Sequence, residues 1–156
     1  MESAGVRVQE KPQQKEIMNW KKFFGAFIAA FVFIFAFGFL WHAKLMHGPY
    51  QEVPTLWRTE TDFGNYFPWL VLGQLVIAFF LTMLCARFTP AGGAGGGATL
   101  GILVALVYIG ADLIFFAVQP LTTKILLGYI AGDLIEFAIA GAIIGALYKP
   151  GSPTAS

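Results

Sequence analysis

Three acidic residues stand out because they interrupt long apolar stretches of the chain. Asp112 lies in a run that begins near Ala98, and Asp133 and Glu136 lie in a run that begins near Ile125. An ionisable side chain inside a membrane-spanning segment is costly and marks a candidate functional site. Carboxyl groups in such a segment can bind protons or cations, or they can hydrogen bond between helices.

The two histidines both lie where the first apolar run ends, in the sequence WHAKLMHGPY. Imidazole and carboxylate together suit zinc, iron or manganese. However, His42 and His47 are five residues apart and point in different directions on a continuous helix. The chain also has no HxxxH, HExxH or ExxH pair. The spacing therefore identifies no metal ligand, and the sequence names no cofactor.

Nucleophilic catalysis is not indicated either. The serines are confined to the two ends of the chain, and no G-x-S-x-G sequence is present. The single cysteine, Cys85, lies at the far end of another apolar run from the histidines. We therefore predict no catalytic residue.

The elements that hold these residues are predicted from the apolar runs. The chain of 156 residues is 57% hydrophobic and 12% charged, whereas a soluble domain carries about 25% charged residues. Apolar runs of roughly 18 residues are long enough to cross a membrane, and in lipid they must be helical. We expect an all-α membrane protein with four transmembrane helices in an antiparallel bundle, at about 20–46, 67–87, 98–118 and 125–148.

The rest of the chain is expected to be irregular. Residues 1–18 and 150–156 are predicted to be polar disordered tails around a membrane domain of residues 19–149. The sequence RFTPAGGAGGGA is predicted to be a flexible linker, and it lacks the GK[ST] ending of a phosphate-binding loop. A net charge of +1 argues against a nucleic-acid partner.

The positive charges predict the orientation in the membrane. Of the ten lysines and arginines, three would lie outside if both termini are cytoplasmic: Lys44, Arg58 and Lys124. The other seven would lie inside, as cytoplasmic loops prefer. We therefore expect an N-in, C-in topology with the loop between the first two helices outside. Aromatic residues of this loop, Tyr50 and Trp57 among them, and Trp41 are expected to anchor it at the headgroups.

A rise of about 1.5 Å per residue places the polar residues of three helices in the outer half of the bundle. By this arithmetic Gln74 is about 10 Å and Asp133 about 12 Å from the outer surface, and Asp112 lies roughly 21 Å along its outward-running helix. We therefore predict a polar pocket below the first loop. Its candidate residues are Gln74, Asp112, Gln119, Asp133 and Glu136, with His42 and His47 at the rim.

Four interpretations of these residues remain open. The acids can be protonated and hydrogen bonded across helices in a purely structural role. They can form a ligand-binding or transport site, or a metal site with a histidine, or they can contact a partner subunit.

Small and aromatic residues suggest how helices associate, within the chain or with a partner. Gly128 with Gly132, Gly141 with Gly145, and Gly97 with Gly101 have the four-residue spacing that lets backbones approach closely in lipid. The fourth helix is expected to be central. The first helix carries phenylalanines all around its circumference, and we expect it to be peripheral, facing lipid or a partner subunit or second copy.

Several sequence features resemble a known group of proteins. These are His47-Gly48 after an aromatic-rich helix, the Trp57-Arg58 pair, YFPWLVLGQLVIAF, and AVQPL at 117–121. Residues 18–149 are similar to small four-helix bacterial membrane proteins of unknown function. The resemblance implies a bacterial inner-membrane location but implies no activity.

We therefore expect an integral membrane protein that is an accessory subunit of a membrane complex, or that binds a small molecule or ion in its outer half. The alternative is a small membrane metalloenzyme, or a redox or pigment-binding subunit, that uses the histidines and carboxylates.

Overall fold

The computed structural model describes residues 18–89 and 93–150. All but one residue of each predicted disordered tail, and residues 90–92 of the glycine-rich linker, lie outside the described residues. The described parts are helical apart from short connections. The helices are α1 (Trp20–Leu40), a π-helical turn (Trp41–Leu45), α2 (His47–Gln51), a 3₁₀ turn (Pro54–Leu56), α3 (Glu60–Phe88), α4 (Gly93–Val118) and α5 (Thr123–Leu147).

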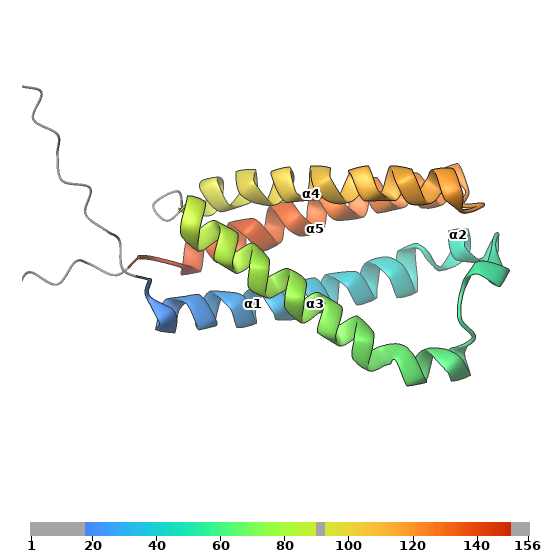
Figure 1. Cartoon of the computed structure of the whole chain (residues 1–156), viewed down its shortest axis with the longest axis horizontal. Helices are drawn as coiled ribbons and strands as arrows, with labels where there is room; N and C mark the ends of the chain where they lie inside the picture. Colours follow the sequence, from blue (N-terminus) through green and yellow to red (C-terminus); the bar gives the residue numbers. More distant parts are fainter. Residues whose placement is uncertain (1–17, 90–92, 151–156) are drawn as a thin grey trace, which may run out of the picture.

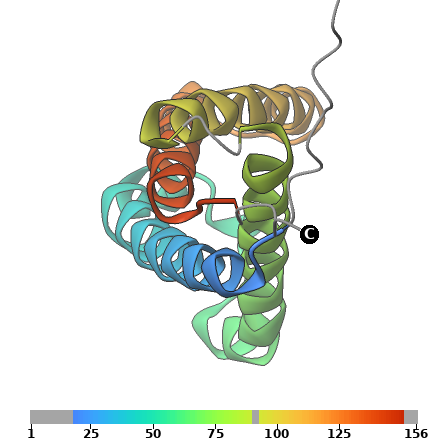
Figure 2. The same ribbon diagram turned by 90° about the vertical axis from the view of Figure 1, so that its left-hand side faces the viewer.

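Four of these helices are long and apolar enough to cross a membrane, which confirms the predicted fold class: α1 with its π turn, α3, α4 and α5. They run antiparallel, and α1 begins at the same end at which α5 ends (Figure 1). We name this the terminal end, and the opposite end, which carries α2, the loop end. Viewed from the terminal end, α1, α5, α4 and α3 follow one another around the bundle (Figure 2).

Helix α3 begins at Glu60, earlier than the predicted start at residue 67. The side chain of Thr59 caps the helix by accepting a hydrogen bond from the Asp62 backbone amide (3.3 Å). Glu60 and Asp62 place negative charge in the first turn, where the helix dipole favours it. Pro68 consequently lies inside the helix and not in its first turn.

Helix α4 begins at Gly93, inside the stretch that the sequence predicts to be a flexible linker. Glycine has a low helix propensity, so packing must stabilise this turn. A Cβ atom at Gly97 would overlap the carbonyl oxygen of Gly141, and one at Gly101 would overlap that of Phe137. The backbones of α4 and α5 therefore touch along their terminal halves, as the small-residue spacing predicts.

Gly128 and Gly132 on α5 also lie in a packing interface, but they receive side chains from the end of α1. The Trp41 indole lies over Gly132, and the Met46 side chain lies over Gly128. Trp41 Nε1 also donates a hydrogen bond to the Gly128 carbonyl oxygen (3.1 Å). Trp41 is therefore part of the helix interface, and its expected place in the headgroup belt stays a prediction.

Helix α1 contacts both α3 and α5, so the prediction of a peripheral first helix is wrong. Its buried residues include Phe23, Ala26, Ala30 and Ile34. The most exposed membrane helix is α4, which packs mainly on α5 and has side chains such as Val107 that are 73% exposed. The predicted central position of the fourth membrane helix is confirmed, because α5 contacts α1, α3 and α4.

Helix α3 is inclined to the other helices and diverges from α4 and α5 toward the loop end (Figures 1 and 2). Its 29 residues span about 43 Å, which is longer than a hydrocarbon core of about 30 Å. Tilting is one way in which a long helix fits the membrane. At the loop end this inclination separates α3 from α1 and leaves space between the two helices.

Candidate functional site

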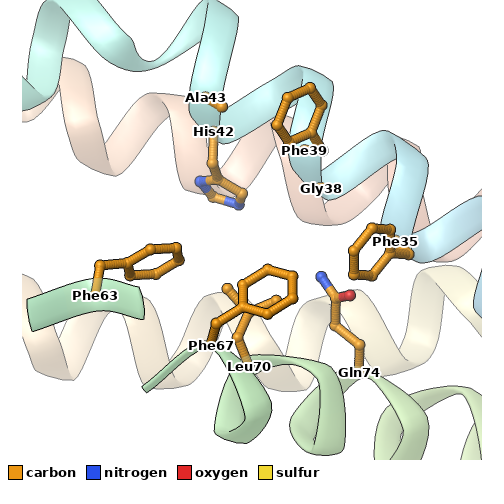
Figure 3. Close-up of a pocket in the computed structure, with 9 residues that line it drawn as sticks. All are labelled: Phe35, Gly38, Phe39, His42, Ala43, Phe63, Phe67, Leu70 and Gln74. Carbon is orange, nitrogen blue, oxygen red and sulfur yellow. The ribbon is translucent and has the colours of Figure 1, made fainter. Parts of the chain in front are cut away.

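The π-helical turn at the end of α1 positions His42. The backbone amide of Met46 donates to the carbonyl oxygen of Trp41, five residues earlier (2.8 Å). Five residues make about one turn here, so Trp41 and Met46 both reach α5. His42 follows Trp41 and points from α1 toward α3 (Figure 3). Such π turns occur frequently at functional sites.

A cleft of about 250 Å³ lies between α1 and the first half of α3. Its walls are mostly aromatic, and its polar side chains are an imidazole from the π-helical turn after α1 and an amide from α3. Figure 3 shows both polar groups directed into the space between the two helices. The residues that line the cleft are Phe35, Gly38, Phe39, His42, Ala43, Phe63, Phe67, Leu70 and Gln74.

Gln74 is the residue of the cleft whose hydrogen bonding is incomplete. Its Oε1 is buried and has no partner among the described residues. Its Nε2 lies against Gly38, and a Cβ atom added to Gly38 would be 3.1 Å from this nitrogen. Buried polar groups are nearly always hydrogen bonded, so an unpaired amide in a cavity wall suggests that another molecule supplies the partner.

His42 is bound on its other side by Tyr50 of α2. Nδ1 of His42 lies 2.6 Å from the Tyr50 hydroxyl oxygen, and the two rings are almost parallel. Trp57 holds Tyr50 in place by donating from Nε1 to its backbone carbonyl (3.1 Å). Burial, with Tyr129 and Asp112 nearby, raises the pKa of Tyr50 above its ordinary value. Tyr50 therefore stays a neutral hydroxyl.

The three membrane carboxylates form a second group on α4 and α5. The carboxyl groups of Asp112 and Asp133 lie within hydrogen-bonding reach of each other. Such a bond requires a proton on one of them, because an ionised carboxylate only accepts. Without that proton, Oδ2 of Asp112 is buried and has no partner in the described chain. Glu136 is close enough to Asp133 to influence it electrostatically.

Two tyrosines connect the carboxylates to the cleft. Tyr129 of α5 lies between them, within hydrogen-bonding reach of Tyr50 and under the electrostatic influence of Asp112. The rings of Tyr50 and Tyr129 meet edge to face with centroids 6.3 Å apart. A series of polar residues therefore extends from the cleft toward the α4–α5 interface: His42, Tyr50, Tyr129, Asp112 and Asp133.

The predicted site residues are thus divided between two places. His42 and Gln74 line the cleft, whereas Asp112, Asp133 and Glu136 lie together at α4 and α5. Gln119 is exposed after the end of α4, and His47 is exposed at the start of α2. Neither contributes to the cleft lining.

Sequence reasoning missed Tyr50 as part of the site and assigned it to headgroup anchoring. The sequence signal for its contact with His42 is weak, because this contact depends on the π turn and α2 bringing residue 50 back over residue 42. Tyr129 shares the α5 stripe of Asp133 and Glu136, so its inward direction follows from helical spacing.

The histidines and carboxylates do not converge on one point. In residues 18–89 and 93–150, no group of three or more His, Cys, Asp or Glu side chains is arranged to hold a metal ion. Tyr50 and Tyr129 lie between His42 and the carboxylates, and the His42 ring meets that of Tyr129 edge to face with centroids 6.0 Å apart.

No protein-family model, curated protein or solved structure matches this chain. The resemblance to four-helix bacterial membrane proteins therefore stays a prediction.

Proposed function

We propose that this integral membrane protein binds a small, largely apolar molecule that carries a hydrogen-bonding group, in the cleft between α1 and α3. The observation that carries the proposal is the Gln74 side chain, which points into an aromatic cleft with a buried, unpaired Oε1 opposite His42. The ligand would supply the missing hydrogen bond.

The free-energy cost of burying the Gln74 Oε1 without a hydrogen bond supports a binding role for this residue. Leaving a buried acceptor unpaired costs about 1–3 kcal/mol. A leucine at this position would fill the same space without that cost. No hydrogen bond of the described chain compensates Oε1, so the fold alone gives no reason for an amide here.

The shape of the cleft supports entry from the lipid. It lies between two membrane helices and not along the bundle axis. Its aromatic walls provide the apolar surface that ligand pockets commonly have, and its two polar groups can fix the ligand's orientation.

The charge distribution supports an N-in, C-in orientation, which would place the cleft in the outer half of the membrane. At the terminal end the described cations are Lys21, Lys22, Arg87 and Lys149, and the described acids lie elsewhere. At the loop end, Arg58 pairs with Asp62 and Lys124 pairs with Glu52. The third described cation at the loop end is Lys44. The terminal end therefore has four described cations and no described acid, and the loop end has three cations with acids among them, which is the bias that the positive-inside rule assigns to a cytoplasmic terminal end.

The other predicted roles have less support. An accessory-subunit role has no observation in its favour beyond the exposed apolar surface that any lipid-facing helix has. The predicted location in a bacterial plasma membrane is supported by the sequence resemblance alone. A haem or chlorophyll macrocycle is larger than the cleft. For a metalloenzyme, the described residues hold no group of three or more His, Cys, Asp or Glu side chains that could bind a metal ion.

The proposal is tested by purifying the protein in polymer-bounded native membrane discs and identifying bound small molecules by mass spectrometry. We expect one compound to be enriched over bulk lipid in the wild type and lost from Gln74→Leu. Gln119→Leu is the matched control, because it makes the same change at an exposed glutamine outside the cleft. The proposal is wrong if no compound is enriched, or if both variants retain it equally.

A further inference from the structure

We infer that the ligand of the cleft is a single-ring quinone or quinol with an apolar tail, held by Gln74 and His42 at its ring oxygens. This inference rests on the proposed function and specifies its ligand class. Four properties of the cleft lead to it: its charge, its walls, its size and the state of His42.

The absence of fixed charge in the cleft excludes charged headgroups. None of its lining residues is acidic, and none is a lysine or arginine. Burying an uncompensated charge in such a place is far costlier than burying a neutral polar group. Phospholipid headgroups, fatty-acid carboxylates and ammonium compounds are therefore poor ligands, and a neutral oxygen-bearing group is favoured.

The walls favour a flat ring. Phe35 and Phe39 come from α1, and Phe63 and Phe67 come from α3, so aromatic side chains line both sides of the cleft. Aromatic rings pack well against one another in edge-to-face or offset geometry. The phenylalanines already pack this way among themselves, with Phe35 and Phe67 at a centroid distance of 6.3 Å and an angle of 88°.

The size suits a substituted single ring inside the cleft. A volume of about 250 Å³ lies below the roughly 300–1,000 Å³ of sites that enclose drug-sized molecules. A fused four-ring sterol would not fit. A substituent longer than a few atoms must leave between α1 and α3, where an apolar tail meets lipid.

The two polar groups suit both the oxidised and the reduced ring. Gln74 can donate from its amide nitrogen or accept at its oxygen. Tyr50 engages Nδ1 of His42, which leaves Nε2 for the ligand. This nitrogen donates in one tautomer and accepts in the other, and the Tyr50 hydroxyl can stabilise either. The pair can therefore bind the carbonyl oxygens of a quinone and the hydroxyl groups of a quinol.

The test is native mass spectrometry of the purified protein with decylubiquinone or with decylbenzene, which has the ring and tail but lacks oxygens. We expect one decylubiquinone to bind per chain, with an affinity about tenfold above that of decylbenzene. Gln74→Leu and His42→Leu should each lower decylubiquinone affinity about five- to tenfold and leave decylbenzene binding unchanged. His47→Leu and Gln119→Leu are the matched controls and should bind like the wild type.

His42→Gln covers the case in which His42→Leu does not fold, because glutamine keeps a donor and an acceptor; we expect it to retain part of the preference for decylubiquinone. Equal affinity of the wild type for the two probes would overturn the quinone inference and leave the proposed apolar site standing. If neither probe binds and no compound copurifies, both the inference and the proposed function are wrong.

Discussion

Nδ1 of His42, on the π-helical turn after α1, lies 2.6 Å from the hydroxyl oxygen of Tyr50, on α2. This contact fixes the side chain that points into the cleft to a residue outside the membrane helices. Through Tyr129 it also continues toward the Asp112–Asp133 pair. The geometry of the cleft therefore depends on the connection between α1 and α3 as well as on these helices.

Tyr50 provides a prediction about pH. Because burial raises its pKa, Tyr50 should remain protonated at pH values near 10, where exposed tyrosines ionise. A spectrophotometric titration of the folded protein over this range should count the same number of ionising tyrosines in the wild type and in Tyr50→Phe. One fewer in Tyr50→Phe would show that Tyr50 is accessible and would contradict the packing described.

The same pKa shift predicts how stability changes with pH. The stability that protonated Tyr50 contributes is complete below its unfolded-state pKa of about 10 and is lost as the pH rises above that value toward the higher folded-state pKa. The melting temperature, measured in mild detergent at increasing alkaline pH, should therefore fall less steeply for Tyr50→Phe than for the wild type. Parallel curves for the two proteins would oppose this linkage.

Gly101 and Gly110 offer a matched comparison on α4. Gly101→Ala should destabilise the protein by about 1–3 kcal/mol, because its Cβ would overlap the Phe137 carbonyl on α5. Gly110→Ala should not destabilise it, because no atom lies within 4 Å of the added Cβ. Thermal or denaturant unfolding of both variants checks the prediction, and equal effects would mean that α4 and α5 do not touch at Gly101.

Asp112 tests whether the carboxyl pair is hydrogen bonded. Asp112→Asn keeps a donor and an acceptor for Asp133, so we expect normal expression and a melting temperature close to that of the wild type. Asp112→Leu removes the partner and should lower stability by about 1–3 kcal/mol. Unchanged stability of the leucine variant would show that the two acids do not depend on each other.

The membrane orientation is tested by labelling a cysteine at position 60, the first residue of α3, after Cys85 is replaced. In whole cells a membrane-impermeant thiol reagent should label Glu60→Cys, because we place the loop end outside. Labelling that occurs only after permeabilisation would show that the loop end is cytoplasmic and that the cleft lies in the cytoplasmic half of the membrane.

The membrane helices could be predicted from sequence because uncharged runs of this length have few alternatives in lipid. Their ends were less predictable. The Thr59 cap starts α3 ahead of Pro68, and contact with α5 makes the glycines after Gly93 helical. Neither effect is visible in hydropathy alone.

The sequence indicated some of the residues that the candidate site contains, but not their arrangement. Helical spacing correctly directs Asp112, Asp133 and Glu136 inward. Depth alone could not show that Gln74 belongs to a different interface, because that depends on the inclination of α3 (Figure 1). The π turn that positions His42 over Tyr50 has no sequence signature.

The central claim is that the cleft between α1 and α3 is the ligand site, and photo-labelling tests it most directly. A ubiquinone analogue with a photoreactive azide on its ring would be irradiated with the protein in lipid discs, and the labelled peptides mapped by mass spectrometry. We predict labelling of residues 35–43 and 63–74. This labelling should be strongly reduced in Gln74→Leu and unchanged in Gln119→Leu. Labelling concentrated on the lipid-facing residues of α4, or unaffected by Gln74→Leu, would contradict the account.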